Sequence, residues 1–176
     1  TLIASDSGST IDLSLSIGVG YTILSGADND VLIGSSSDDI LIGGDGSDTF
    51  IVNSGQDSVL GIFTGDILQV ALGAEVLVYN VKNFTATDET KNSGTATFIA
   101  DITGSTIDLS LSSHGDYTLV GNTGVDVFTG GNGNDILIGN GTTGELPPER
   151  FSALSQVAGS NTFNILAGTD IIIDLT

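Results

Sequence analysis

The stretch Gly43-Gly44-Asp45-Gly46-Ser47-Asp48-Thr49-Phe50-Ile51 is one of a series of nine-residue units. Five consecutive units begin at Ser25, Gly34, Gly43, Val52 and Gly61. The sixth residue of every unit is an aspartate: Asp30, Asp39, Asp48, Asp57 and Asp66. The eighth is always large and apolar: Leu32, Leu41, Phe50, Val59 and Leu68. A fixed nine-residue period of this kind predicts a solenoid built from short turns and short strands.

The spacing within each unit also predicts how the units stack. Alternate side chains of a strand lie on opposite faces, so we expect the apolar eighth residue to point inward. The first six residues, rich in Gly, Ser and Asn, form the turn. One unit then makes half a coil, a full coil takes about 18 residues, and alternate units stack about 4.8 Å apart. We therefore predict an all-β, parallel β-roll or β-solenoid, with Asp30, Asp48 and Asp66 along one edge and Asp39 and Asp57 along the other.

The chain also contains a long internal duplication. Residues 1–44 and 97–140 align without a gap and are identical at 22 of 44 positions. The match then resumes with a longer shift, which places an insertion at about 141–157. We expect two tandem β-roll copies, residues 1–96 and 97–176, with additional strands at 67–81 and 106–112. The second of these strands alternates, which predicts Ile107, Leu109 and Leu111 on one inward face. The sixth positions of the second copy are Asp126, Asp135, Asn161 and Asp170. Only residues 150–157, in the insertion, are expected to form a short helix.

The charge balance indicates a cation. The 176 residues include 22 Asp and Glu but only 3 Lys and Arg, and the net charge is −19. Carboxylates gathered in successive turns repel one another, so a positive ion must stabilise the compact form. Nucleic acid and anionic membranes are poor partners for a surface of this charge, so we expect no nucleic-acid binding and no membrane insertion. No apolar run is long enough to insert into a bilayer as a helix, and cysteine is absent.

Two units, Gly43–Ile51 and Gly130–Ile138, match the pattern G-G-x-G-x-D-x-U-x throughout. At these residues the chain resembles the RTX, or haemolysin-type, calcium-binding repeat family. The resemblance implies a parallel β-roll with Ca²⁺ between successive turns, bound by sixth-position carboxylates and by turn carbonyls. Ca²⁺ takes six to eight oxygen ligands. The candidate metal ligands are Asp28, Asp30, Asp39, Asp45, Asp48, Asp57, Asp66, Asp126, Asp135 and Asp170. The competing interpretation is that these aspartates are Asx-turn or solvated loop carboxylates.

No catalytic apparatus is evident in the sequence. His114 is the sole histidine and corresponds to Gly18 in the first copy, so we expect a surface loop residue. Without cysteine or a second histidine, zinc sites and most nucleophilic sites are excluded. Asp12 and Asp108 lie in identical blocks and are expected to face solvent from strands. We therefore expect no enzyme activity and no catalytic residues.

Two functions fit these features. The first is an extracellular, secreted or cell-surface structural protein that folds on Ca²⁺ and self-assembles as a homo-oligomer or polymer, such as a surface layer, filament or matrix, because open solenoid ends recruit further copies. The alternative is a calcium-triggered folding and secretion module of a larger type I-secreted exoprotein or adhesin. An adhesin or ice binder would need a flat, regular outer face, and no repeated Thr array supports one.

Overall fold

The computed structural model describes residues 1–4, 7–139, 162–164 and 171–173. Every regular element in these ranges is a β-strand, and none is a helix. Accordingly, the described residues include no helix suited to crossing a membrane. The predicted insertion at 141–157, with its short helix at 150–157, lies outside the described residues.

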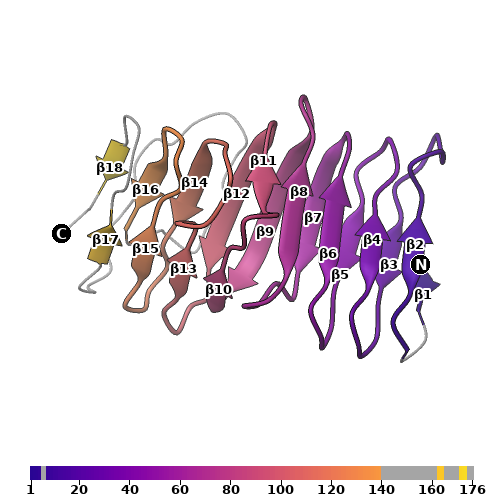
Figure 1. Cartoon of the computed structure of the whole chain (residues 1–176), viewed down its shortest axis with the longest axis horizontal. Helices are drawn as coiled ribbons and strands as arrows, with labels where there is room; N and C mark the ends of the chain where they lie inside the picture. Colours follow the sequence, from indigo (N-terminus) through magenta and orange to yellow (C-terminus); the bar gives the residue numbers. More distant parts are fainter. Residues whose placement is uncertain (5–6, 140–161, 165–170, 174–176) are drawn as a thin grey trace.

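The strands are short, as nine-residue units require, and Figure 1 labels them along the length of the molecule. In chain order they are β1 (Leu2–Ile3), β2 (Thr10–Asp12), β3 (Thr22–Leu24), β4 (Val31–Ile33), β5 (Ile40–Ile42), β6 (Thr49–Val52), β7 (Gln56–Leu60), β8 (Ile67–Val70), β9 (Glu75–Val81), β10 (Asn83–Thr85), β11 (Lys91–Asn92), β12 (Thr95–Ala100), β13 (Thr106–Asp108), β14 (Tyr117–Val120), β15 (Val127–Thr129), β16 (Ile136–Ile138), β17 (Thr162–Asn164) and β18 (Ile171–Ile173).

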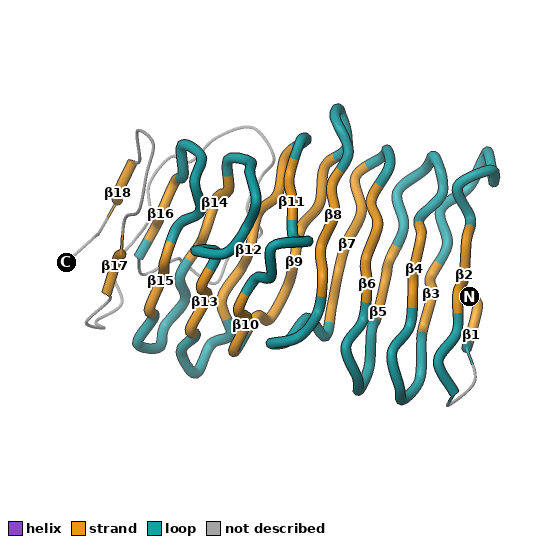
Figure 2. Tube along the Cα trace, viewed as in Figure 1, coloured by secondary structure: helices purple, strands orange, loops and turns teal. Residues whose placement is uncertain are grey.

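The strands form a parallel β-solenoid, which confirms the predicted fold. Sheet A runs the whole length in the order β1-β3-β5-β7-β9-β12-β14-β16-β18. Sheet B, ordered β11-β8-β6-β4-β2, covers the first half, and sheet C, ordered β10-β13-β15-β17, covers the second half. Figure 2 shows the strands of successive coils side by side, with turns at both edges. Every pairing between described strands is parallel, because each coil returns to its start before the next begins.

The register confirms a coil of two units. Val31 pairs with Thr49, and Thr49 pairs with Ile67, so equivalent residues lie 18 positions apart. The apolar eighth residues stack in the core and are fully buried: Leu32, Leu41, Phe50, Val59, Leu68, Phe128 and Leu137. Burial of this aliphatic and aromatic column is the main favourable term holding the coils together. The prediction that the eighth position points inward is therefore confirmed.

The predicted strand at 106–112 is shorter than its alternation indicates. Strand β13 ends at Asp108, whose carboxylate accepts a hydrogen bond from the Ser110 N–H at 2.9 Å. A turn follows, in which the Ser112 N–H donates to the Leu109 carbonyl. Ile107 and Leu109 are buried as expected, but Leu111 is 59% exposed. The prediction for Leu111 was wrong because a local Asx turn ends the strand.

Candidate metal centre

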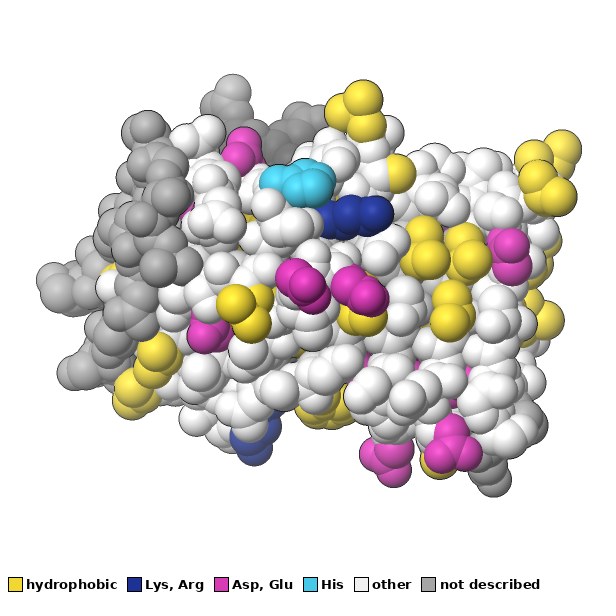
Figure 3. All heavy atoms as spheres, in the orientation of Figure 1, with side chains coloured by type: hydrophobic (Ala, Val, Ile, Leu, Met, Phe, Trp, Pro, Cys, Tyr) yellow, Lys and Arg dark blue, Asp and Glu magenta, His cyan; other side chains and the backbone are white. Residues whose placement is uncertain are grey.

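The sixth-position aspartates are almost completely buried, although nothing in their side chains favours an apolar interior. Asp30, Asp39, Asp48, Asp57, Asp66 and Asp135 are each 1% exposed, and Asp126 is 0% exposed. Their burial follows from the strand geometry, because the sixth and eighth residues lie on the same side of the chain. On the face drawn in Figure 3, only scattered acidic side chains reach the surface. Much of the negative charge therefore lies inside the turns.

The aspartates form two columns, one at each edge of the solenoid. In the first column, the Asp30 N–H donates to Asp48 Oδ1 at 2.9 Å, and the Asp48 N–H donates to Asp66 Oδ1 at 2.8 Å. In the second, the Asp39 N–H donates to Asp57 Oδ1 at 2.9 Å. Each carboxylate thus uses one oxygen to fasten its own coil to the coil before it. The stacking predicted from the nine-residue period is present in the structure.

The second carboxylate oxygens fall into two groups. Asp39, Asp66, Asp126 and Asp135 each accept an N–H from their own turn through Oδ2, the donors being Ser35 at 2.5 Å, Phe63 at 2.7 Å, Asn122 at 3.0 Å and Gly131 at 2.7 Å. The Oδ2 atoms of Asp30, Asp48 and Asp57 are buried and have no hydrogen-bond partner. A buried, unsatisfied carboxylate oxygen is costly, because the charge has lost its hydration without compensation. These three oxygens are the places where a cation is most needed.

Glycines at the first position of a unit keep the space beside two of these oxygens open, those of Asp48 and Asp57. A Cβ atom on Gly34 would lie 2.7 Å from Asp57 Oδ2 and 3.0 Å from Asp39 Oδ2. A Cβ atom on Gly43 would lie 2.5 Å from Asp48 Oδ2, and one on Gly130 would lie 2.5 Å from Asp135 Oδ2. None of these three glycines has a positive φ. At Gly34, Gly43 and Gly130 a side chain would therefore fill the space that the carboxylates face, whereas Ser25 and Val52 hold the first position of two other units.

The turn that begins at Gly43 contains two further glycines, Gly44 and Gly46, which are needed for their backbone conformation, as the sequence predicts. Gly44 and Gly46 have φ values of 93° and 123°, in the region that side chains rarely adopt. In the preceding coil, Asp28 stands where the pattern has glycine, and its φ is 67°. Asp28 and Asp45 are both exposed. The structure therefore leaves these two predicted ligands outside the buried columns.

Burial perturbs the ionisation of several column members. Desolvation raises the pKa of Asp57 to about 7, and repulsion from Asp39 and Asp38 adds to the rise. Desolvation also raises the pKa of Asp66 to about 6, and it raises the pKa of Asp48 and of Asp126. Hydrogen bonds from backbone N–H groups oppose the shift in each case. Near neutral pH the columns must therefore take up either protons or a metal ion to relieve this penalty.

The structure also contains a second ladder that the sequence reasoning missed. Fifth-position side chains accept an N–H from the following coil: Ser47 donates to Asn29 Oδ1 at 2.8 Å, and Gln56 donates to Asp38 Oδ1 at 2.9 Å. It runs opposite to the sixth-position ladder, in which the donor belongs to the preceding coil. The sequence did contain a signal for this ladder: Asn29 and Asp38, the fifth residues of their units, both have a side-chain oxygen that can accept a hydrogen bond.

The remaining predicted residues are placed as follows. Asp12 and His114 are exposed, as expected, whereas Asp108 is half-buried and faces solvent only in part. Asp170 lies outside the described residues. Within the described ranges, no three or more His, Asp or Glu side chains converge on one point. A metal ion here must therefore take most of its oxygen ligands from turn carbonyls, with one or two carboxylates.

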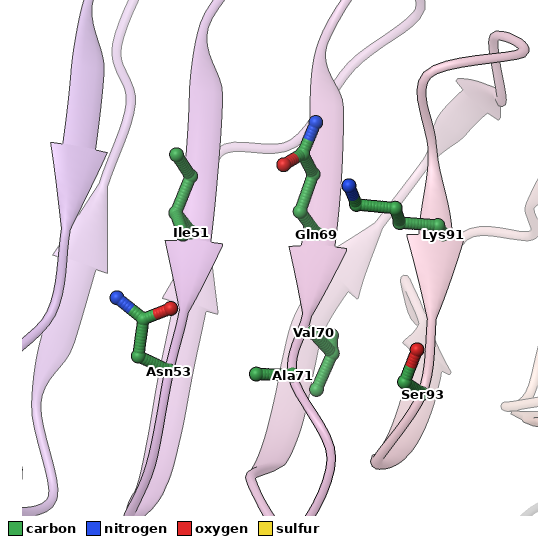
Figure 4. A pocket seen from close by; sticks show the side chains of 7 residues that line it. All are labelled: Ile51, Asn53, Gln69, Val70, Ala71, Lys91 and Ser93. Atoms are coloured by element: carbon green, nitrogen blue, oxygen red, sulfur yellow. The ribbon is translucent and has the colours of Figure 1, made fainter.

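A shallow groove on the outer face of sheet B offers a different chemistry. It lies over β6, β8 and β11, and Figure 4 shows Ile51, Gln69 and Lys91 along it. Its lining contains no carboxylate. The groove is therefore not a candidate calcium site, and the buried columns at the turns carry the metal chemistry.

Comparison with known families agrees with this geometry. The family model of the RTX calcium-binding nonapeptide repeat matches residues 24–59 and 118–143, in four copies. These two segments are RTX calcium-binding repeats. They contain Asp30, Asp39, Asp48 and Asp57 in the first segment and Asp126 and Asp135 in the second. No curated protein and no solved structure matches the chain.

The RTX repeats confirm the resemblance seen in the sequence and identify calcium as the metal. The residues present also fit it, because Ca²⁺ prefers hard oxygen ligands in a flexible arrangement. Buried oxygens without partners on Asp30, Asp48 and Asp57 supply the charge. Gly43 and Gly34 keep the space beside Asp48 and Asp57 free of side chains.

Proposed function

We propose that this chain is an extracellular structural protein whose RTX repeats fold around Ca²⁺. The observation that carries the proposal is the set of unsatisfied buried oxygens of Asp30, Asp48 and Asp57. With a net charge of −19 and only three basic residues, the chain cannot neutralise these groups itself. Asp30, Asp39, Asp48, Asp57, Asp66, Asp126 and Asp135 would hold the ions together with turn carbonyls. Bound Ca²⁺ supplies the positive charge that joins one coil to the next.

The weak calcium affinity that is typical of extracellular modules supports an extracellular location. Extracellular calcium modules bind with Kd values on the order of 10⁻⁴–10⁻³ M, so they fill only where calcium is abundant. Because the ion binds the folded chain and not the unfolded one, calcium and folding are coupled. The chain would stay expanded where calcium is scarce and fold on reaching a calcium-rich medium.

A calcium titration followed by circular dichroism tests this coupling. The chelated chain should lose most of its β-sheet signal, and Ca²⁺ should restore it more effectively than Mg²⁺, which dehydrates reluctantly and demands stricter geometry. Asp48→Asn should move the titration midpoint to higher calcium. The matched control is Asp12→Asn, because Asp12 is exposed and bonds only locally to the Ser14 N–H. An unchanged spectrum in chelator would show that calcium is not structural.

Self-association is the second part of the proposal. Strands β1 and β2 are end strands of sheets A and B, and β17 and β18 are end strands of sheets C and A. End strands present unpaired backbone groups to any further strand. We expect assembly into a surface layer, filament or matrix, with attachment to a cell surface as one form. Electron microscopy with and without calcium tests this, and a monomer at every calcium concentration refutes it.

The alternative function is a folding and secretion module of a larger type I-secreted exoprotein or adhesin. The apolar stretch Ile171-Ile172-Ile173, which forms β18, is compatible with such a module. Calcium would then trigger folding only after export. The complete reading frame discriminates between the two functions, since a large catalytic or adhesive domain upstream would favour the module.

A further inference from the structure

The column of buried aspartates along sheet A is interrupted in the middle of the solenoid. In register, Asp57 of β7 pairs with Val76 of β9, and Val76 pairs with Ala96 of β12. Ala96 pairs in turn with Tyr117, the first residue of β14. The column resumes one coil later at Asp135, whose Oδ1 accepts the Tyr117 N–H at 2.9 Å. Three successive coils thus bury an apolar or phenolic side chain where the RTX coils bury a carboxylate.

The opposite edge shows the same interruption. Asp126 directly precedes β15, and Ser105 directly precedes β13, the neighbouring strand in register. A serine therefore replaces the carboxylate in this coil. We call residues 67–117, from β8 to the start of β14, the central section (Figure 1). Its acidic residues are all exposed or only half-buried: Glu75, Asp88, Glu89, Asp101, Asp108 and Asp116.

The buried polar side chains of the central section are neutral and hydrogen-bonded to neutral groups. The Ser105 hydroxyl donates to the Val81 carbonyl at 2.5 Å. The Ser112 hydroxyl donates to the Thr90 carbonyl at 3.1 Å and shares a 2.6 Å hydrogen bond with the Tyr117 hydroxyl. In the first RTX segment, by contrast, three buried carboxylates each keep an oxygen without a partner. A cation relieves that penalty in the RTX coils, and the central section has no such penalty to relieve.

A cluster of aromatic rings joins the same coils. Phe84 stacks on Phe98 with ring centroids 5.4 Å apart, and Phe98 meets Tyr117 edge-on at 6.1 Å. All three rings are buried, and such pairs stabilise a core beyond the area they bury. Strands β9 and β12, which pair with each other here, are also the longest of the described strands. Apolar burial, aromatic contact and strand pairing therefore hold the central section together, and none of them needs an ion.

We propose that the central section keeps its fold without calcium and that the two RTX segments build onto it when calcium binds. Proteins commonly contain cooperative units that open at different free energies. Chains below about 40 residues usually need a disulfide, a metal or a partner to fold, and the central section is longer than that. The residual β-sheet signal of the chelated chain then comes from this section. The proposal rests on calcium as the metal of the RTX segments, and it adds that calcium stabilises the flanks and not the centre.

Amide hydrogen exchange of the full chain, resolved by residue in saturating calcium and in chelator, tests the proposal. Four backbone donors are matched, because each lies 2.8 or 2.9 Å from a carbonyl of the preceding coil: Thr95 and Thr106 in the central section, and Thr49 and Ser58 in the first RTX segment. In chelator, Thr49 and Ser58 should exchange as in an unfolded chain. Thr95 and Thr106 should exchange at least about tenfold more slowly than that. In calcium all four should be protected.

Two matched variants locate the cause, because Phe98 and Phe50 are both fully buried but only Phe98 lies in the central section. In chelator, Phe98→Ala should abolish the slow exchange of Thr95 and Thr106, and Phe50→Ala should leave it unchanged. The opposite pattern would overturn the proposal, and the parent and Phe50→Ala carry the test even if Phe98→Ala fails to fold. Fast exchange of all four amides in the chelated parent would overturn the proposal but leave calcium-coupled folding intact. Slow exchange of all four would overturn both, because the RTX segments would then not need calcium either.

Discussion

Replacing Gly34 by Ala is the most direct test of the calcium geometry. The new Cβ would lie 2.7 Å from Asp57 Oδ2 and 3.0 Å from Asp39 Oδ2, whereas ordinary contact begins at 3.4 Å. Asp57 Oδ2 must therefore retreat by about 0.7 Å. Calcium–oxygen distances span only about 2.3–2.6 Å, so a displacement of this size removes the ligand. The backbone at Gly34 does not have a positive φ, so the substitution adds no conformational strain there.

The expected loss follows from mass action. A site filled at about 100 times its Kd stabilises the fold by about 2.7 kcal/mol. In a chain of this size each kcal/mol shifts the Tm by about 2–4 °C, so Gly34→Ala should lower the Tm by about 5–10 °C in calcium. At the lowest calcium concentration that still folds the parent, the variant and the parent should differ much less in Tm, because the site then contributes little.

Thermal unfolding by circular dichroism at about 10 mM Ca²⁺, roughly 100 times the tighter Kd expected for such sites, measures the effect. The matched control is Gly131→Ala, another glycine substitution in an RTX turn. Its Cβ would meet its nearest neighbour, the Leu109 carbonyl oxygen, at 3.4 Å, which is ordinary contact. The control should keep the Tm of the parent in calcium. An equal loss of Tm at high and at low calcium would mean that Gly34 acts by packing alone and would refute the metal geometry.

Three further predictions follow from burial. Metal-free protein should be more stable near pH 4.5 than near pH 7.5. The folded pKa of Asp57 is about 7 against an ordinary 3.8, so between these values the folded chain binds more protons than the unfolded chain. Its free energy of unfolding therefore falls by up to about 3 kcal/mol from pH 4.5 to pH 7.5. The chelated chain should accordingly keep more of its β-sheet circular dichroism at pH 4.5 than at pH 7.5, and a stronger signal at pH 7.5 would contradict the sign. Leu109→Ala should lower the free energy of unfolding by about 2–5 kcal/mol, because Leu109 is fully buried. The equivalent Leu13→Ala should lower it clearly less, because Leu13 is only partly buried. Paired urea melts in calcium measure both. Tyr117→Phe should lower the free energy of unfolding by about 0.5–1.5 kcal/mol, because it removes the 2.6 Å hydrogen bond between Tyr117 and the buried Ser112 hydroxyl. The control Tyr79→Phe should show no such loss in the same melts.

The repeat period alone was enough to predict most of the architecture. Nine residues per half-coil determine that Leu32, Phe50 and Leu68 stack in one column and that Asp30 and Asp48 stack beside it. These relations are local, because a strand alternates its side chains and a coil must close before the next begins. The same argument overextended β13 at Leu111, where an Asx turn competes with strand pairing.

Only the tertiary structure decided how deeply each repeated residue is buried and which hydrogen bonds it makes. Asp39 and Asp57 occupy the same position of the unit, yet Asp39 Oδ2 accepts an N–H from its own turn and Asp57 Oδ2 has no partner. Identical residues also differ, since Ile107 is buried beneath β10 and Ile11 is not. The period determines which side chains share a column, because that depends on backbone geometry along the chain. Burial and satisfaction of a carboxylate depend on the neighbouring coil and on the path of one turn, and these exist only once the coils are stacked.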